Sequence, residues 1–463
     1  MGVYMNSIKK LFAPSDMTTG VPWKKILLFT FPMLIGNIAQ QLYNTVDSIV
    51  VGKYVGDNAL AAVGSASPIF NLLLVLFVGV STGTGIMVAQ YFGAKEREEL
   101  SKTIGNSITL TALASIILMV IAFFTIRPLL VLIQTPSSII EWCYDYLFIL
   151  MMGIAGLAYY NILGGILRGL GDSTSALVYL LIATVINIVL DLFFVAKLNM
   201  GVAGVALATV IAQTISSILC MMKLLKLTHL FDLKLEYFKL SAKETKHIIR
   251  LGLPTGITQA IFSMAMIMVQ SLTNSFGEML IAAIVIIMRV DGFAMMPNFS
   301  FGTAMTTYAG QNVGAAKYDR VEQGSKQGTL IAVGVATAIT LIILIFGDIL
   351  MFAFTDTAEL VTLSMRMMRI LAVGYIAVAV TQSLSGVIRG AGDTMTPMWI
   401  SLITTVIIRV PLAYGLTYLT KSAEYPNGRA ESLFISLLAS WVLGALLTFI
   451  AYRRGKWKSK ALR

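Results

Sequence analysis

The chain alternates long apolar runs with short polar connections along its whole length. About 20 consecutive apolar residues are enough to cross a bilayer core of roughly 30 Å as a helix, and runs of this kind recur from one end of the sequence to the other. The pattern predicts an all-α polytopic membrane protein with twelve spans, at residues 24–49, 58–82, 103–126, 140–166, 175–196, 201–223, 248–273, 279–301, 328–354, 364–387, 395–419 and 431–452.

Composition and charge agree with this picture. Only 12% of the 463 residues are charged, about half the share of an ordinary soluble domain. With the N-terminus inside, 25 of the 34 lysines and arginines fall on the cytoplasmic side of the predicted spans, as the positive-inside rule requires. The net charge of +11 is therefore a topology signal and not a nucleic-acid footprint. It predicts a multi-pass protein of the cytoplasmic membrane with both termini in the cytoplasm.

The second half of the chain repeats the first. GGILRGLGDSTSALVYLLIATVINIVL (164–190) aligns with SGVIRGAGDTMTPMWISLITTVIIRVP (385–411) at an offset of 221, and AQYFGA (89–94) aligns with GQNVGA (310–315). An even number of spans separates the copies, so both face the same way. This predicts two pseudo-symmetric six-helix lobes in a parallel repeat, an architecture typical of alternating-access transporters. The expected N-lobe is 1–222, the cytoplasmic connector 223–250 and the C-lobe 251–463, the connector lying on the membrane surface or forming a solvated linker.

The two halves of the repeat differ in the positions of their acidic residues. At this offset Asn187 aligns with Ile408, Asp191 with Leu412, and Asp47 with Met268 or Val269. We therefore expect the first half to hold intramembrane acids that the second half lacks, and to use them for a task performed once per molecule.

Span directions bring these polar residues to one depth. Asp47 and the pair Asn187 and Asp191 lie near the outer ends of the first and fifth spans, and Asn187 and Asp191 share a helical face. The sixth span runs inward, which puts Thr209 about 12 Å below its start and Gln213 one turn deeper. We expect an ion-coupling site made of Asp47, Asn187, Asp191 and Thr209.

The residue types suggest what this site holds. Two carboxylates in a poorly solvated cavity cannot both ionise cheaply, so a proton can be held between them. The same oxygens suit a hard cation such as Na⁺. The alternative is an interhelical hydrogen-bond network that only joins the first and fifth spans.

Other features suggest a substrate cavity and local packing. The cavity would be formed by polar residues of the first and sixth spans and by flexible methionines of the second half, although ordinary packing explains the methionines equally well: Gln40, Gln41, Asn44, Gln213, Met264, Met288 and Met295. In the two R-G-x-G-D turns we expect local Arg–Asp pairs, Arg168 with Asp172 and Arg389 with Asp393. STGTG (81–85) lacks the ending of a P-loop and is interpreted as a helix-packing element.

Taken together, these motifs resemble the multidrug and toxic compound extrusion (MATE) family. The resemblance covers about residues 20–450 and rests on FPMLIGNIAQQLYNTVDSIVVGKYVGDNALAAVG, on AQYFGA and GQNVGA, and on the paired RGLGDST and RGAGDTMTP turns. It implies two lobes that export amphiphilic, often cationic, compounds against inward H⁺ or Na⁺ flow. The chain is similar to the DinF-like branch, in which an N-lobe cluster couples transport; that cluster maps onto Asp47, Asn187, Asp191 and Thr209. The acids that the NorM-like branch uses in its C-lobe are here Phe262 and about Val378.

The sequence thus predicts a secondary active multidrug antiporter, not an enzyme, with no cofactor beyond the coupling ion. Expected partners are small amphiphilic cations and membrane lipids, with no nucleic acid, and the protein is expected to be a monomer. One alternative is a flippase for a lipid-linked oligosaccharide, which would line its cavity with several basic residues, whereas here only Arg289 and Arg409 qualify. A passive channel or membrane scaffold is the other alternative, and the asymmetric acids disfavour it.

Overall fold

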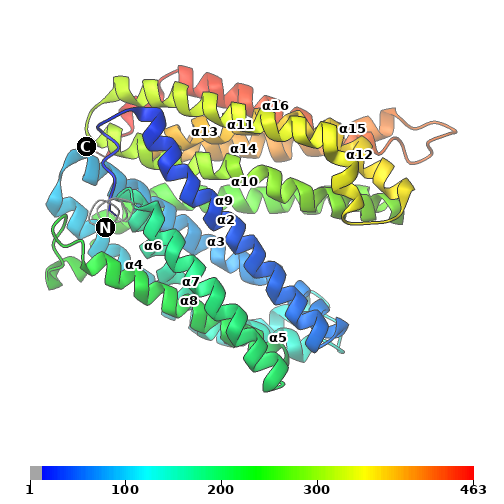
Figure 1. Ribbon diagram of the computed structural model, residues 1–463, viewed down its shortest axis with the longest axis horizontal. Coiled ribbons are helices and arrows are strands. Elements are labelled where there is room, and N and C mark those ends of the chain that lie inside the picture. The colour runs from blue at the N-terminus through cyan, green and yellow to red at the C-terminus, as the bar shows by residue number, and fades with distance from the viewer. Residues whose placement is uncertain (1–12, 463) are drawn as a thin grey trace, which may run out of the picture. The chain divides into compact units, whose positions relative to one another are not determined.

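The structure, a computed structural model, describes residues 13–462 apart from the side chains of residues 72 and 76, and the elements in this part of the chain are all helical (Figure 1). Within it, ten helices are long and apolar enough to cross a membrane. Two further pairs of helices are bent by 51° and 42° at a short break, and counting each pair as one span gives twelve. The predicted all-α polytopic architecture is confirmed.

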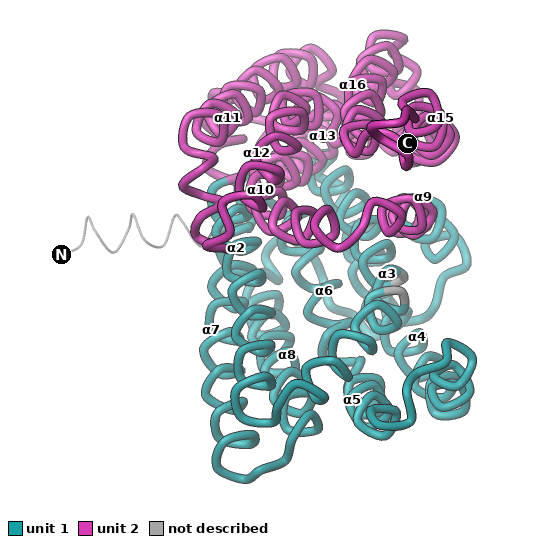
Figure 2. The backbone as a smooth tube through the Cα atoms, turned by 90° about the vertical axis from the view of Figure 1, so that its right-hand side faces the viewer, with its two compact units in different colours: residues 1–16, 31–256 teal, residues 17–30, 257–463 magenta. Residues whose placement is uncertain are grey.

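The chain forms two compact units, drawn in teal and magenta in Figure 2. The first contains residues 1–16 and 31–256, and the second contains residues 17–30 and 257–463. Two helices therefore contribute to both units: α2 (Pro22–Tyr54) and α9 (Ala242–Asn274). The connector 223–250 lies wholly within the first unit.

Besides its share of α2 and α9, the first unit is built from the helices that precede the connector. These are α3 (Asp57–Ala94), α4 (Arg97–Leu132), α5 (Ile140–Met152), α6 (Ile154–Gly169), α7 (Ser173–Asp191), the π-helical turn η1 (Leu192–Lys197) and α8 (Gly201–Leu225), followed by the 3₁₀ turn η2 (Leu235–Phe238). Several helices run past the predicted spans, because hydropathy marks only the part that would cross lipid. The polar ends of α3 and α4 continue the helix beyond it.

The second unit repeats this order after α9. Its elements are α10 (Glu278–Gly314), α11 (Tyr318–Phe352), α12 (Ala358–Ala372), α13 (Gly374–Gly390), α14 (Met395–Leu402), the π-helical turn η3 (Ile403–Ile408), α15 (Arg409–Leu419), α16 (Glu431–Arg453) and the 3₁₀ turn η4 (Lys456–Ser459). The figure colours these helices green to red (Figure 1).

Each bent pair breaks at a glycine that packs closely on the last long helix of its own unit. A Cβ on Gly153, between α5 and α6, would lie 2.3 Å from Cγ1 of Val210 on α8. A Cβ on Gly374, at the start of α13, would lie 2.5 Å from Cε3 of Trp441 on α16. The two glycines are 221 residues apart, so the bend is part of the repeated design.

The turns repeat as well, and they correct one prediction. Gly171 and Gly392 both have positive φ, 85° and 100°, a conformation that glycine adopts without steric cost. The following aspartates cap the next helix: Asp172 accepts from the backbone N–H of Ser175 at 2.9 Å and Asp393 from that of Thr396 at 3.1 Å. Among the described residues no ion pair joins either aspartate to the arginine four residues before it, because the carboxylate is used as a helix cap.

The glycines of STGTG pack helices, as predicted. A Cβ on Gly83 of α3 would lie 2.4 Å from the carbonyl oxygen of Ile248 on α9, and one on Gly252 would lie 2.3 Å from the carbonyl oxygen of Gly79. Gly85 in turn faces the backbone of Gly165 on α6. Small residues at these positions let the backbones approach closely, which is how helices associate within lipid.

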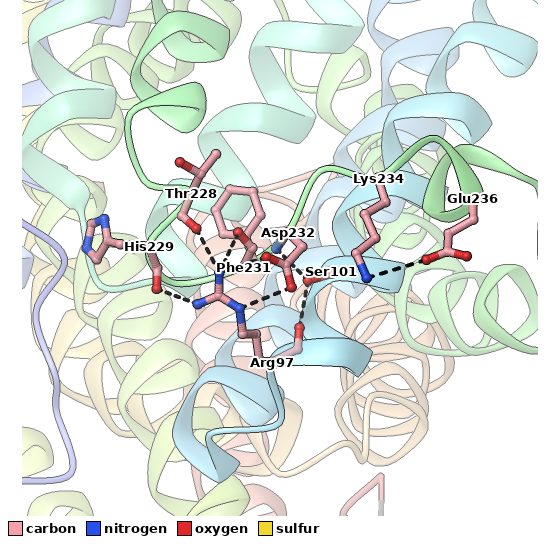
Figure 3. A network of polar contacts seen from close by, with 8 residues as sticks. All are labelled: Arg97, Ser101, Thr228, His229, Phe231, Asp232, Lys234 and Glu236. Atoms are coloured by element: carbon pink, nitrogen blue, oxygen red, sulfur yellow. Dashed lines mark hydrogen bonds and ion pairs between the residues drawn. The ribbon is translucent and has the colours of Figure 1, made fainter.

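The connector is held on α4 by a polar clamp (Figure 3). The guanidinium of Arg97, at the first position of α4, donates to the backbone carbonyls of Thr228 at 2.9 Å and His229 at 2.5 Å. It also pairs with the Asp232 carboxylate at 2.8 Å. This pairing holds the pKa of the Asp232 carboxyl below its usual range. The side chain of Phe231, the residue before Asp232, is fully buried.

A second set of bonds holds the end of the connector. Asn106 of α4 is 1% exposed and accepts from the backbone N–H of Ser241 at 2.8 Å. Thr109 donates to the carbonyl of Phe238 at 2.7 Å, and a Cβ on Gly105 would lie 2.3 Å from the carbonyl oxygen of Tyr237. The segment before α9 is therefore folded against α4.

The second unit holds the segment before α2 in a similar way. Arg320, in the first turn of α11, donates to the backbone carbonyls of Met17 at 3.0 Å and Thr19 at 2.8 Å. Gln311 of α10 accepts from the N–H of Met17 at 2.8 Å, and the Met17 side chain is fully buried. The two units thus use the same device. Arg97 of α4 holds the segment before α9, and Arg320 of α11 holds the segment before α2.

Candidate functional site

The first unit brings Asp47 of α2 together with Asn187 and Asp191 of α7. Asn187 and Asp191 are fully buried, and their spacing of four residues places them one above the other on one face of α7. In the amide orientation that satisfies both acids, Asn187 Nδ2 donates to Asp47 Oδ1 at 2.9 Å and to Asp191 Oδ2 at 3.2 Å. We call these three residues the acid cluster.

The two carboxyl groups of the acid cluster lie close enough to interact directly. Two ionised carboxylates repel each other at this distance, whereas a single shared proton turns the contact into a hydrogen bond. Among the residues that the structure describes, none forms a hydrogen bond with Asp191 Oδ1, so the cluster keeps a free acceptor. The arrangement can take up and release one positive charge.

Two tyrosines border the acid cluster. Tyr43 precedes Asp47 by one turn of α2, is 7% exposed, and donates through its hydroxyl to Thr209 Oγ1 at 3.0 Å. Tyr43 and Tyr146 of α5 both interact electrostatically with Asp47 and Asp191. Thr209 of α8 is thus connected to α2 through Tyr43. The sequence analysis did not single out either tyrosine, because an aromatic residue in a span has no distinguishing pattern.

A buried cluster of valines packs against Tyr146, which also interacts with both acids. Val50 and Val51 of α2, Val195 of η1 and Val205 of α8 belong to one buried cluster, against which Val46 and Tyr146 pack. Asp191 is the last residue of α7 before the π-helical turn η1, an irregularity that is frequent at functional sites. Because the surroundings are apolar, a charge on either acid interacts strongly with its neighbours.

Four other polar residues were predicted to lie near the site, and none of them is hydrogen-bonded to either acid among the described residues: Gln40, Gln41, Asn44 and Gln213. Gln213 is buried and its Oε1 has no partner. The side chains of Gln40 and Asn44 are exposed, and that of Gln41 is partly buried.

The three methionines predicted to line the substrate cavity also differ in their exposure. The side chains of Met264 and Met288 are exposed, at 45% and 49%, whereas that of Met295 is buried at 8%. The exposure of the Met264 and Met288 side chains does not distinguish contact with lipid from contact with a substrate. The substrate cavity stays a prediction.

The second unit contains an acid that the sequence analysis overlooked. Asp291 of α10 lies within reach of the hydroxyl of Tyr375, in the first turn of α13, and near Arg409, the first residue of α15. Asp291 Oδ1 and Arg409 Nε have no hydrogen-bond partner. The expectation that the second half lacks intramembrane acids is therefore wrong. It failed because the repeat was compared only at the positions of the first-half acids, and Asp291 aligns with Phe70.

This second group, Asp291, Tyr375 and Arg409, also differs from the C-lobe acids of the NorM-like branch. The positions aligned with those acids, Phe262 and Val378, are apolar, and Val378 is buried. Here the acid is on α10 and has a basic partner. We call this group the Asp–Arg cluster.

Few of the described side chains are placed to bind a metal ion. Among the described residues no group of three or more histidines, cysteines, aspartates or glutamates is placed to hold a metal ion. The acid cluster offers two carboxylates, and carboxylate oxygens suit Na⁺ more than a transition metal. Occupancy by Na⁺ stays a prediction.

Comparison with known proteins agrees with the repeat. The MatE family model matches residues 32–193 and again residues 254–415. The chain is similar to the probable multidrug resistance protein YoeA of Bacillus subtilis (strain 168), with 29% identity over 449 residues that cover 95% of each chain. The similarity to YpnP of the same organism, also called a probable multidrug resistance protein, is 28% over 451 residues, covering 96% of this chain and 98% of that one.

Solved structures agree with the fold. A MATE protein crystallised in complex with MaL6 superposes with a TM-score of 0.88 at 25% identity, covering 95% of this chain and 97% of that one. A multidrug resistance MATE family transporter of the MOP superfamily, in an outward-facing conformation, gives 0.87 at 25% identity, with the same two coverages. The two matches to the family model together cover more than half of the residues of this chain. The chain therefore belongs to the MatE family of multi-pass membrane transporters.

Proposed function

We propose that this transporter is a secondary active exporter of small amphiphilic, mostly cationic compounds, driven by inward flow of H⁺ or Na⁺ through the acid cluster. The relatives named as multidrug resistance proteins support the substrate class. The observation that carries the coupling is the contact between the Asp47 and Asp191 carboxyl groups around the fully buried Asn187. An acid pair of which Asp191 is fully buried changes its interactions with each ion bound or released.

The cycle follows from the states of this pair. In the outward-facing state the pair accepts an ion, and the altered hydrogen bonds between α2 and α7 favour release of the compound. In the inward-facing state the ion leaves to the cytosol and a new compound binds. Free energy passes from ion to compound only if the two states of α2 and α7 differ in affinity for both.

Two observations bear on the coupling ion. The direct contact of the two carboxyl groups favours a shared proton, since an ionised pair at that distance is strongly unfavourable. Among the described residues Asp191 Oδ1 has no hydrogen-bond partner, and this free oxygen favours a site that can bind Na⁺. The proposal therefore includes both ions, and an experiment separates them.

The experiment is substrate efflux from vesicles in which the pH gradient and the Na⁺ gradient are imposed separately. Purified protein is reconstituted, a fluorescent organic cation is loaded, and efflux is followed with each gradient alone, with both and with neither. Efflux that accelerates with one gradient identifies the coupling ion. Equal rates in all four conditions would contradict the proposal and favour a passive channel.

A flippase for lipid-linked oligosaccharides has less support. It would need several basic residues facing a cavity, and only Arg289 and Arg409 lie near the middle of the predicted spans. Arg409 lies beside Asp291, so its charge is matched within the second unit. Placement in the cytoplasmic membrane with both termini inside is part of the same proposal and rests on the distribution of lysines and arginines. A monomeric state is part of it as well.

A further inference from the structure

A pocket of about 400 Å³ lies at the start of α9, far along the first unit from the acid cluster. It lies between the first turns of α4, the connector and the first turn of α9, and its volume is within the range of small-molecule sites. Four glutamates and three lysines line it together with Tyr237, Leu240 and Ser241: Glu98, Glu99, Lys102, Glu236, Lys239, Lys243 and Glu244.

The deepest charged group of this pocket is the carboxylate of Glu244. The residue is only 2% exposed and its Oε2 has no hydrogen-bond partner. The nearest cation is the ammonium of Lys243, 3.9 Å from Oε1, which is too far for a hydrogen bond. A buried carboxylate without a bonded partner is costly, so an ammonium group placed beside Glu244 would lower that cost.

Among the described residues, none of the three lysines that line the pocket lies within hydrogen-bond distance of the Glu244 carboxylate. Lys102 is bonded to Glu98 at 2.8 Å and to Glu99 at 3.0 Å. Lys243 is 65% exposed and is shared between Glu99, at 3.4 Å, and Glu244. A ligand ammonium can replace Lys243 beside Glu244, because the lysine loses only a long and solvated contact.

The rest of the lining indicates the shape of the ligand. Leu240 and Tyr237 offer apolar surface. Glu236, whose side chain is 61% exposed and lies 3.7 Å from the Lys234 ammonium, adds a second carboxylate. Figure 3 shows the Lys234–Glu236 pair beside the Arg97 clamp. Carboxylates separated by apolar surface match an aliphatic chain with an ammonium group at each end.

We propose that this pocket is a cytoplasmic binding site for an aliphatic diamine or polyamine. One ammonium binds Glu244 and Glu99, the methylene chain lies on Leu240 and Tyr237, and the second ammonium faces Glu236. The bound ligand joins α4 to the first turn of α9, which itself continues into the second unit. The site is separate from the acid cluster, and binding there does not depend on the proposed transport reaction.

The test is calorimetric titration of the full-length protein in detergent with spermidine. We expect saturable binding to one site. The Glu244→Gln variant, which keeps the size and removes the charge, is expected to bind about tenfold or more weakly, and Glu99→Gln gives a second readout should Glu244→Gln fail to fold. Glu424→Gln, at an exposed loop position outside the pocket, is the matched control and should bind as the unaltered protein does.

A third variant separates a ligand site from a structural role. Lys243→Ala removes the competing ammonium and is expected to bind spermidine several-fold more tightly, which a merely structural lysine would not produce. Absence of spermidine binding to the unaltered protein would overturn the proposal. So would an affinity that Glu244→Gln and Glu99→Gln leave within twofold, or a Lys243→Ala variant that binds more weakly.

Discussion

The acid cluster and the Asp–Arg cluster occupy the two units of a repeated chain, yet they differ in charge and in depth. In the first unit two acids and an amide meet without a basic partner. In the second unit one acid lies beside an arginine and a tyrosine. Asp47 is about 10 Å from the end of α2, whereas Asp291 is about 20 Å from the start of α10. The repeat supplies the framework, and each half adds its own chemistry.

This difference assigns different roles to the two clusters. An acid pair without a counter-charge changes its net charge with every ion it binds, so it can couple to a gradient. An acid beside an arginine is already neutralised, and we expect its role to be the connection of helices within the unit. Both clusters adjoin a π-helical turn: Asp191 directly precedes η1 and Arg409 directly follows η3. That turn is shared, so it does not decide the role.

The largest expected effect is the loss of coupling on neutralising one acid of the first cluster. Asp47→Asn should reduce gradient-driven export to the level of protein-free vesicles, because the remaining acid can no longer share a proton or complete an oxygen site. Efflux from proteoliposomes measures it. Asp356→Asn, at an exposed outer position, is the control, and export by Asp47→Asn at the unaltered rate would remove this cluster from the mechanism.

In the second cluster, a single neutralisation should cost stability rather than coupling. Asp291→Asn leaves Arg409 without its acid, and we expect it to lower the free energy of unfolding by about 1–3 kcal/mol. Thermal unfolding in detergent gives the shift. The double variant Asp291→Asn with Arg409→Met should recover much of it, because the unpaired charge is removed as well. A double variant less stable than Asp291→Asn would argue against a structural pair.

The bent helices provide a test of what the two halves share. Gly153→Ala and Gly374→Ala place a Cβ 2.3 Å from Val210 and 2.5 Å from Trp441, so each should destabilise its unit by about 1–3 kcal/mol through overpacking. Gly64→Ala and Gly292→Ala meet nothing within 4 Å and should be neutral or slightly stabilising. Strong destabilisation in only one half would mean that the bends are not equivalent.

The smallest expected effect separates the two arginine clamps. Arg97 pairs with the Asp232 carboxylate, whose pKa it lowers, whereas Arg320 binds backbone carbonyls of residues 17 and 19. The stabilisation from Asp232 is present above the pKa of this carboxyl in the unfolded chain, about 4, and is lost as the pH falls through its lower value in the folded protein. Residues 228–232 should therefore open in acid before residues 17–19.

Hydrogen exchange of backbone amides at several pH values, corrected for the intrinsic rate, measures this difference. In the Arg97→Gln variant residues 228–232 should already be less protected at neutral pH, and the acid dependence should disappear. Equal acid sensitivity of both segments in the unaltered protein would refute the assignment to Asp232.

Much of this architecture could be predicted from the sequence, because lipid leaves helices few alternatives. Apolar run length predicted the spans, and the offset of 221 predicted the repeat. The hydropathy of residues 140–166 did not reveal the bend at Gly153, since the residues on either side are equally apolar and only the fit against Val210 requires it. Most predicted spans are shorter than the helices that contain them, because polar turns continue a helix beyond the lipid.

The acid cluster could be anticipated because Asp47, Asn187 and Asp191 are polar residues in apolar segments. Their tyrosine neighbours could not, because Tyr43 and Tyr146 are recognisable only from contacts between helices. Asp291 was visible in the sequence, and it was missed by searching only the positions paired with first-half acids. The clamp at Arg97 depends on how the connector folds, which no periodicity indicates.

The most direct test of this account compares Asp191→Asn with Asp291→Asn in the same vesicle preparation. Both variants replace an intramembrane aspartate by its amide, and export of an organic cation is driven by whichever ion gradient the unaltered protein uses. The account predicts background export for Asp191→Asn and at least about half of the unaltered rate for folded Asp291→Asn. Export that survives in Asp191→Asn and disappears in Asp291→Asn would contradict it, because coupling would then reside in the second unit.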